Sequence, residues 1–286
     1  MARVFRKNIL GADKVILRTD LALENTEPQK QVRREEDGCV VTHIDEDGKS
    51  YITVEVPAIS DHLDADRGVL KLVVEELNTL LPKEGMALVA GLGNRAITPD
   101  AIGPMTAENV MATRHITGEV ARLTGLEDLR PVAVIAPGVL GNTGIEAMEL
   151  LKALVHKLKP SVVIAVDALA ARSPARLGCT VQLSSAGISP GAGVGNARPR
   201  IDESTLGVPV IGMGIPTMVD ATTLAYDLLG EEYRDAMDKV EPRGAPMMVT
   251  PREIDLIIGR GARLLGMGVN LALNPSLSVE EFEELI

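Results

Sequence analysis

The feature that most constrains the fold is a series of short apolar runs separated by helix-length segments. Each run is short enough for one strand that is buried on both faces. The runs lie at 86–90, 132–136, 161–166 and 210–213. Helical patterns are expected at 66–81, 106–123, 143–158, 218–229 and 251–265. This alternation predicts βαβ units, and therefore an α/β fold whose mainly parallel sheet has helices on both faces.

Two segments before the first buried run do not follow this pattern. Residues 39–56 alternate as a β-hairpin around Asp47-Gly48, a favoured two-residue turn. Residues 18–36 are charged and interrupted by a proline, so their composition favours a solvated, mobile arm. We therefore expect one α/β domain with an N-terminal arm and a hairpin lobe.

Composition restricts where the protein can be located and which partners it can bind. The net charge is −11 and aromatic residues make up only 2%, which argues against a nucleic-acid surface. The apolar runs are too short to cross a bilayer, and the first residues lack the apolar stretch of a signal peptide. Cys39 and Cys179 are expected to be free thiols. The sequence therefore predicts a cytoplasmic protein that binds neither nucleic acid nor membrane.

Two aspartates follow buried runs. Asp100 lies on the loop after 86–90, and Asp167 directly follows 161–166. Ligands of open α/β sheets bind outside the carboxyl ends of the strands, so both carboxylates are expected at that edge. Two neighbouring carboxylates share a proton, and such a pair can activate water and protonate a leaving amine. For Asp167 the residues alone leave a second reading open, the N-cap of a helix continuing through 168–171.

Two glycine-rich loops are candidates for substrate binding. The first resembles a dinucleotide fingerprint, but Pro99 falls where the phosphate-binding helix should continue, so a nucleotide-binding oxidoreductase is the weaker alternative. The second has the wrong glycine spacing and no clear buried strand before it. It is either a flexible loop or one that binds an extended peptide backbone. The candidate substrate-binding residues are Gly91, Gly93, Asn94, Gly191, Gly193 and Gly195.

No other motif suggests a nucleophile, a metal or a cofactor. The four histidines are scattered without metal-ligand spacing, and no serine lies in a G-x-S-x-G motif. We therefore expect no metal and no cofactor at the site.

Several motifs, in order along most of the chain, resemble the germination proteases of spore-forming bacteria, endopeptidases that degrade small acid-soluble spore proteins. The motifs include RTDLALE (18–24), GLGN (91–94), TPDAIGP (98–104), TRHI (113–116), PGVLGNTGIE (137–146), DALAAR (167–172), SSAGISPGAGVGN (184–196), GIPTMVDA (214–221) and MVTPREID (248–255).

The resemblance implies an atypical aspartic protease with Asp100 and Asp167 as its catalytic pair. It also implies a zymogen cut between Asp20 and Leu21, so that 1–20 is a propeptide and 21–286 a single α/β protease domain. A homotetramer in the forespore or spore core is implied as well. The segment 229–247 is shorter here than in relatives of this family.

The family is similar in fold, of the phosphorylase/hydrolase-like type, to the hydrogenase maturation endopeptidases. Such an enzyme with nickel at its site is therefore an alternative, although the histidine pattern does not supply nickel ligands. A noncatalytic spore structural protein is a third hypothesis.

Overall fold

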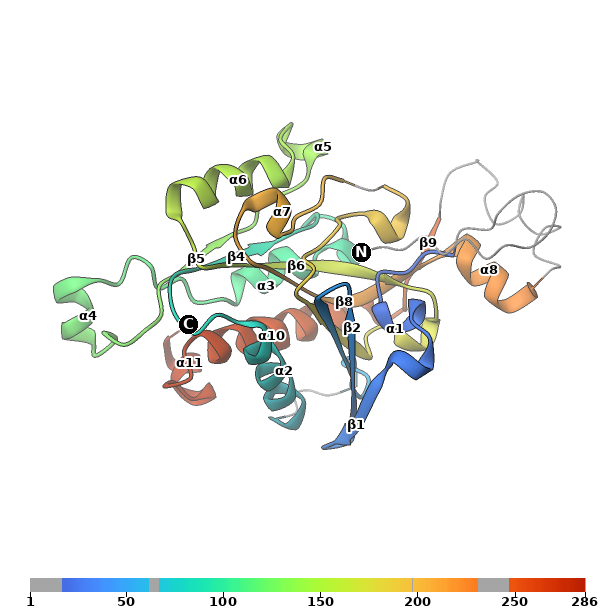
Figure 1. Ribbon diagram of the computed structural model, residues 1–286, viewed down its shortest axis with the longest axis horizontal. Helices are drawn as coiled ribbons and strands as arrows, with labels where there is room; N and C mark the ends of the chain where they lie inside the picture. The colour runs from blue at the N-terminus through green and yellow to red at the C-terminus, as the bar shows by residue number, and fades with distance from the viewer. Residues whose placement is uncertain (1–16, 62–66, 197, 231–246, 286) are drawn as a thin grey trace.

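The computed structural model describes residues 17–61, 67–196, 198–230 and 247–285 (Figure 1). Within these residues nine strands form one sheet, in which the short strand β9 (Met248–Val249) pairs with β8. From one edge to the other the remaining strands are β1 (Val32–Glu36), β2 (Cys39–Glu46), β3 (Lys49–Glu55), β7 (Thr180–Ser184), β8 (Val210–Asp220), β6 (Val162–Ala171), β4 (Ala87–Gly91) and β5 (Val132–Ile135).

The α/β class is confirmed, and the sheet has a parallel part and an antiparallel part. Strands β5, β4, β6 and β8 run parallel to their neighbours in this group, as the buried runs predicted. The hairpin β2–β3 turns at Asp47 and Gly48, both of which have positive φ as a two-residue turn of this type requires. Strand β7 runs antiparallel between β3 and β8 and joins the hairpin to the parallel strands. The hairpin is thus part of the main sheet.

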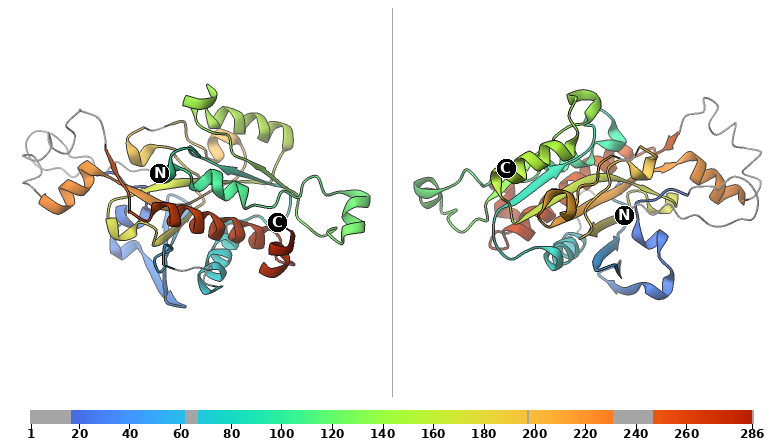
Figure 2. Two further views of the ribbon diagram at one scale, coloured as in Figure 1. Left: turned by 180° about the vertical axis from the view of Figure 1, so that it is seen from behind. Right: turned by 45° about the horizontal axis from the view of Figure 1, so that its top comes forward.

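Helices cover both faces of the sheet, as Figures 1 and 2 show. One face packs against α2 (Arg67–Leu80), α3 (Ile102–Glu108) and α10 (Ile254–Leu273), and the other against α6 (Ala147–Leu158) and α7 (Glu203–Leu206). Helix α10 is longer than the predicted 251–265. By length and composition it is the one described helix that could cross a membrane, but 72% of its most apolar window is buried inside the protein. It is the core helix of this face.

Two helical patterns were predicted too long. The segment 106–123 is interrupted because the chain leaves α3 at Asn109, and Thr113 then bonds to the backbone of β5 before α4 (Gly118–Thr124) begins. The segment 143–158 divides into α5 (Leu140–Thr143) and α6, since the chain turns at Gly144 with φ 72°. The capping box of α6 is consequently formed by Glu146 and Glu149.

The end of the chain shows a similar shift in boundaries. Residues 218–220 belong to β8, so α8 spans only Ala221–Leu229, and the short helix α11 covers Val279–Leu285. Position 66 and most of the shortened segment 229–247 lie outside the described residues.

The prediction of a mobile arm over 18–36 is wrong. The chain forms the short helix α1 (Ala22–Asn25), a 3₁₀ turn at Pro28–Lys30 and strand β1. Leu21 is 0% exposed and packs with Leu169, Ala171 and Val219. The average composition of the segment did not indicate that it is folded, because the two leucines that anchor it, Leu21 and Leu23, stand among charged residues. Residues 1–16 lie outside the described residues.

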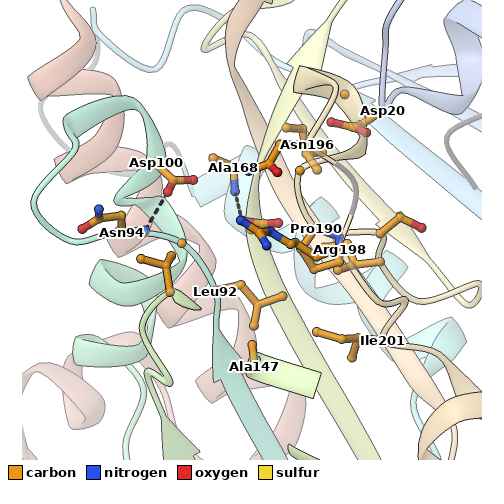
Figure 3. A pocket seen from close by; sticks show the side chains of 18 of the residues that line it. Asp20, Leu92, Asn94, Asp100, Ala147, Ala168, Pro190, Asn196, Arg198 and Ile201 are labelled. Atoms are coloured by element: carbon orange, nitrogen blue, oxygen red, sulfur yellow. Dashed lines mark hydrogen bonds between the residues drawn. The ribbon is translucent and has the colours of Figure 1, made fainter. Parts of the chain in front are cut away.

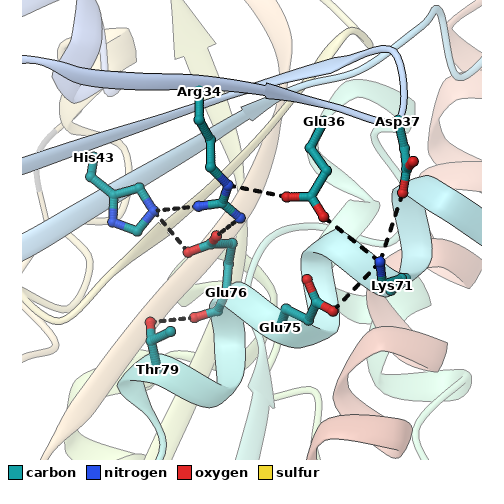
Figure 4. Close-up of polar contacts among 8 residues, drawn as sticks. All are labelled: Arg34, Glu36, Asp37, His43, Lys71, Glu75, Glu76 and Thr79. Carbon is teal, nitrogen blue, oxygen red and sulfur yellow. Dashed lines mark hydrogen bonds and ion pairs between the residues drawn. The ribbon is translucent and has the colours of Figure 1, made fainter.

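A buried carboxylate fixes the outer strands to helix α2 (Figure 4). Glu76 of α2 is only 2% exposed, and its Oε1 accepts a 2.6 Å hydrogen bond from Arg34 Nη2 of β1. His43 Nε2 of β2 lies 3.0 Å from Glu76 Oε2. Since a buried carboxylate is costly without such partners, this cluster sets how the hairpin and β1 sit on the helix.

Candidate active site

Asp167 lies within a strand. Strand β6 continues through it to Ala171, so the reading of Asp167 as the N-cap of a helix over 168–171 is wrong. The reason is long-range pairing, because β8 runs alongside β6 as far as Val219 and supplies ladder hydrogen bonds that a local helix would have to replace. The side chain is 7% exposed, and Oδ1 accepts a 2.9 Å hydrogen bond from the backbone N–H of Ala168.

Asp100 ends the 3₁₀ turn Thr98–Asp100, which follows strand β4. Its Oδ2 accepts a 2.7 Å hydrogen bond from the backbone N–H of Asn94. Gly93 has φ 110°, and a Cβ at that position would overlap the Asp100 carbonyl, so this turn requires glycine. Thr217 Oγ1 of β8 holds the Pro99 carbonyl at 2.7 Å. The glycine loop therefore holds the carboxylate itself, and the sheet holds the turn that carries it.

Asp100 and Asp167 line one cavity of about 550 Å³ at the carboxyl ends of the parallel strands. A third carboxylate, that of Asp20, lines the same cavity. In Figure 3 Asp100 and Asp20 lie on opposite sides, with Ala168 between them. The cavity also has a cation, Arg198, whose Nη1 lies 3.3 Å from Glu146 Oε1.

The glycine candidates divide into two groups. Four of the six substrate-binding candidates line the cavity, namely Gly93, Asn94, Gly191 and Gly193. Gly91 and Gly195 are not among its lining residues. A Cβ on Gly91 would overlap the Gly103 carbonyl, so Gly91 lets helix α3 pack against β4. Gly195 packs against the Arg18 guanidinium. The second loop also follows a buried strand, β7, which the sequence analysis did not find.

The cavity favours protonated carboxyls. Burial raises the pKa of Asp167 well above its ordinary value, and the negative charges of Asp100 and then Asp20 raise it further. Burial also raises the pKa of Asp100, while the Asn94 N–H opposes that rise by stabilising the ionised form. Asp20 touches the open volume of the cavity and is only partly buried, yet protein surrounds it closely enough to raise its pKa to about 6.

The segment that begins at Asp20 runs from the cavity wall along the end of β6. The Asp20 N–H donates to the Ala170 carbonyl at 2.8 Å, and Ala170 N–H donates to Asp20 Oδ2 at 2.9 Å. Further along, the Glu24 carboxylate accepts hydrogen bonds from the backbone N–H groups of Arg172 and Ser173, at 2.7 and 3.0 Å. Residues 20–24 thus lie along the end of β6.

Sequence reasoning missed several polar side chains of the cavity, among them Arg198 and Gln182. Gln182 lies in β7, which alternates as Thr180, Gln182 and Ser184 on one face, with Val181 and Leu183 on the other. That alternation was visible in the sequence and signals a strand with one polar face. Its length of five residues hid it among loop-like glycines and serines.

The arrangement can perform general acid–base chemistry on a bound peptide. A protonated carboxyl can give a proton to a leaving amine while an ionised one takes a proton from water. In the part of the chain that the structure describes, no group of three His, Cys, Asp or Glu side chains is placed to hold a metal ion.

Comparisons with known proteins agree with one another on the family. A family model described as germination protease matches residues 24–233. The germination protease of Caldanaerobacter subterraneus subsp. tengcongensis is 39% identical, covering 94% of this chain and 98% of that protein. That of Clostridium perfringens strain SM101 is 38% identical (94% and 99%), and that of Bacillus velezensis 33% (96% and 97%). The first alignment spans 318 positions, more than the 286 residues of this chain, so this relative has inserted residues.

Among solved structures, a [NiFe] hydrogenase maturation protease from Thermococcus kodakarensis aligns with a TM-score of 0.38 and 15% identity. The alignment covers 68% of this chain and 98% of that one. At this TM-score the likeness is too weak for the two sites to be compared.

Proposed function

This chain belongs to the germination protease family, and we propose that it is a self-processing aspartic-type endopeptidase that starts the degradation of small acid-soluble spore proteins. The observation that carries the proposal is one cavity lined by Asp100, Asp167 and Asp20, the last of which belongs to a segment of the chain that is hydrogen-bonded to the end of β6. Asp100 and Asp167 form the catalytic pair, and the Asp20–Leu21 bond is the one cut during self-processing.

The electrostatics support different roles for the two carboxyls, with Asp167 as the general acid and Asp100 as the general base. Asp167 has the pKa that is raised more, by burial and by two neighbouring carboxylates, so it holds the proton. Asp100 accepts a hydrogen bond from Asn94 N–H, which favours its ionised form, so it takes a proton from water. The water oxygen adds to the peptide carbonyl carbon. The carbon–nitrogen bond then breaks, and the leaving nitrogen takes the proton of Asp167.

The bound segment supports self-processing. Residues 20–24 lie along the end of β6, with Asp20 at the cavity wall against the backbone of Ala170 and Leu21 buried in an apolar cluster. Residues 1–20 are accordingly the propeptide, and 21–286 the active protease domain. The same contacts describe what a substrate offers: an acidic residue before the cut, an apolar one after it, and a second acidic residue where Glu24 now lies.

We propose the location from the role of the enzyme and the assembly from its resemblance to the family. Small acid-soluble spore proteins lie in the spore core, so the enzyme works in the forespore or spore core, as a homotetramer, and without a nucleic-acid or membrane partner. It needs no metal and no cofactor for the carboxylate pair to act.

The proposal is tested by following the N-terminus of the purified chain. We expect a new terminus at Leu21, appearing faster at mildly acidic than at neutral pH. Protonation relieves repulsion between Asp20 and the catalytic pair, whose charges already raise the pKa of Asp167. Asp167→Asn should not acquire this terminus when it is alone in solution. A cut elsewhere, or the same cut in the isolated variant, would contradict self-processing.

The substrate is tested by adding the processed protein to an acid extract of spores. Loss of the small acid-soluble proteins, with new termini that follow acidic residues, is the expected result. If the processed wild-type chain leaves the extract intact, the substrate assignment is wrong.

A further inference from the structure

The side-chain amide of Gln182 forms hydrogen bonds to the backbone on both sides of Leu21. Nε2 donates a 2.8 Å hydrogen bond to the carbonyl oxygen of Asp20. Oε1 accepts a 2.8 Å hydrogen bond from the backbone N–H of Ala22. The Asp20 carbonyl belongs to the Asp20–Leu21 peptide bond, so Gln182 touches an atom of that bond directly. Only one orientation of the amide suits these partners, because the carbonyl needs a donor and the N–H needs an acceptor.

The sheet fixes Gln182 relative to Asp167. In the strand register Asp167 of β6 pairs with Gly214 of β8, and Gly214 pairs with Gln182 of β7. Paired residues of neighbouring strands direct their side chains to the same face, so Asp167 and Gln182 share the cavity face. Two strand spacings, about 10 Å between backbones, separate them. Gly214 lies between them without a side chain, and a Cβ there would overlap the Asp167 carbonyl oxygen.

Burial and strand pairing on both sides hold Gln182 in place. It is 7% exposed in the middle of a fully buried strand, with ladder partners on both sides, Thr53 of β3 and Gly214 of β8. A donor that is already oriented and largely removed from water stabilises a developing negative charge more than a solvated one does. An amide also stays neutral whatever charges the neighbouring aspartates carry.

We infer that Gln182 is a catalytic residue that stabilises the oxyanion formed at the cleaved carbonyl and holds the peptide in register through the N–H of the second residue after the cut. The inference rests on the proposed function, because it takes Asp20–Leu21 as the bond that is cleaved. When water adds to the carbonyl carbon, the π electrons move to the oxygen that Gln182 Nε2 holds. They return as the carbon–nitrogen bond breaks and Leu21 nitrogen takes a proton.

The same two hydrogen bonds restrict which residues a substrate can have after the cut. Gln182 Oε1 needs a backbone N–H two residues after the cut, whichever side chain stands there, so proline is excluded at that position. Ala22 is the first residue of α1, and Leu21 before it is extended at φ −82° and ψ 120°. A proline at 22 therefore fits the backbone conformation, but it lacks the N–H, and its ring carbon takes the place of the hydrogen that Gln182 Oε1 accepts.

The test measures the first-order rate at which the full-length chain acquires a Leu21 terminus. Gln182→Met fills the same volume without a donor, and we expect it to slow processing by about 10²–10³. Thr180→Val is the matched control, since Thr180 lies two residues earlier on the same strand and face and is fully buried. Among the residues that the structure describes, its hydroxyl has no hydrogen-bond partner. It should process within about threefold of the wild type, because it removes no contact to the cut segment.

A second pair of variants leaves the interior of the domain unchanged. Ala22→Pro should slow the cut about tenfold or more, while Ala22→Ser keeps the N–H and should cut normally. Circular dichroism and the thermal midpoint establish that each variant is folded. If the wild type cuts at Asp20–Leu21 and both folded Gln182→Met and Ala22→Pro cut at its rate, the role of Gln182 is wrong and the proposed function stands. If the wild type makes no cut there, the proposed function itself fails.

Discussion

Gly193 and Asp20 are packed so closely that a methyl group on Gly193 would overlap Asp20 Oδ2. The same Cβ would lie 2.7 Å from the Cβ of Ala170, the residue whose N–H holds that oxygen. The glycine-rich loop and the end of β6 therefore enclose Asp20 between them. No side chain larger than hydrogen fits at 193 while Asp20 is bound.

Gly193→Ala should accordingly expel Asp20 from the cavity. We expect self-processing to slow by about tenfold or more, because misplacing a reacting group by about an ångström costs that much or more. Gly141→Ala is the matched control, since Gly141 lines the same cavity and its Cβ would meet nothing within 4 Å. The measurement is the rate of Leu21 terminus formation in both variants. Equal rates would mean that the observed position of Asp20 is not the reactive one.

Asp100→Asn and Asp167→Asn should each lower the rate of peptide cleavage by at least about 10²–10⁴, since each removes one of two carboxyls that act together. Asp128→Asn, at an exposed position, is the control and should keep the wild-type rate. Cleavage of spore proteins and the thermal midpoint are measured for each variant. Near-normal activity in a folded Asp100 or Asp167 variant would remove that residue from the mechanism.

Stability should fall as pH rises through the titration of Asp20. In the unfolded chain Asp20 titrates near 3.8, while burial raises its pKa in the fold to about 6. Between these values the folded state binds more protons than the unfolded state, so its advantage is lost as pH rises from about 4 to about 6. At about 1.4 kcal/mol per pKa unit, the loss is up to roughly 3 kcal/mol.

The measurement compares urea unfolding of Asp100→Asn with that of Asp100→Asn/Asp20→Asn at several pH values. Under the proposed mechanism neither variant can process itself, and the two differ only at position 20. The single variant should lose more free energy of unfolding across this pH range than the double variant does. Parallel curves would show that Asp20 does not titrate differently in the folded state.

Chelators should leave cleavage unchanged. The polar side chains that line the cavity are carboxylates, amides, hydroxyls and Arg198, and its described lining residues include no histidine or cysteine, the donors that nickel and zinc sites favour. The assay is cleavage before and after dialysis against a chelator. Loss of activity that one added metal restores would favour the chemistry of a metal-dependent maturation protease.

Arg34→Met should destabilise the fold by roughly 1.5–3 kcal/mol, because it deprives the buried Glu76 carboxylate of a charged hydrogen bond. Arg33→Met is the control. Arg33 lies next to it on β1 and is more exposed, and it meets Glu55 only at 3.5 Å. It should change stability by less than about 1 kcal/mol. The measurement is the free energy of unfolding of both variants in urea. Equal losses of this free energy would mean that the Arg34–Glu76 contact contributes no more than a surface ion pair.

The sequence alone predicted the central strands, the hairpin and the position of the two catalytic candidates at one edge of the sheet. These features depend on local chemistry. An apolar run buries itself, Asp47-Gly48 adopts a two-residue turn, and parallel strands bring their carboxyl ends to the same edge. The resemblance of the motifs to a known family, confirmed by the family model, then narrowed the hypotheses about the chemistry.

Tertiary structure decided the features that depend on partners far apart in the chain. Asp167 stays in a strand because β8 pairs with it, although the residues after it favour a helix. Asp20 and Gln182 meet across 162 positions of sequence, so no window along the chain contains both. Local propensity is worth less than the hydrogen bonds and burial such contacts supply, and for that reason the bound segment and the Gln182 amide emerged only from the fold.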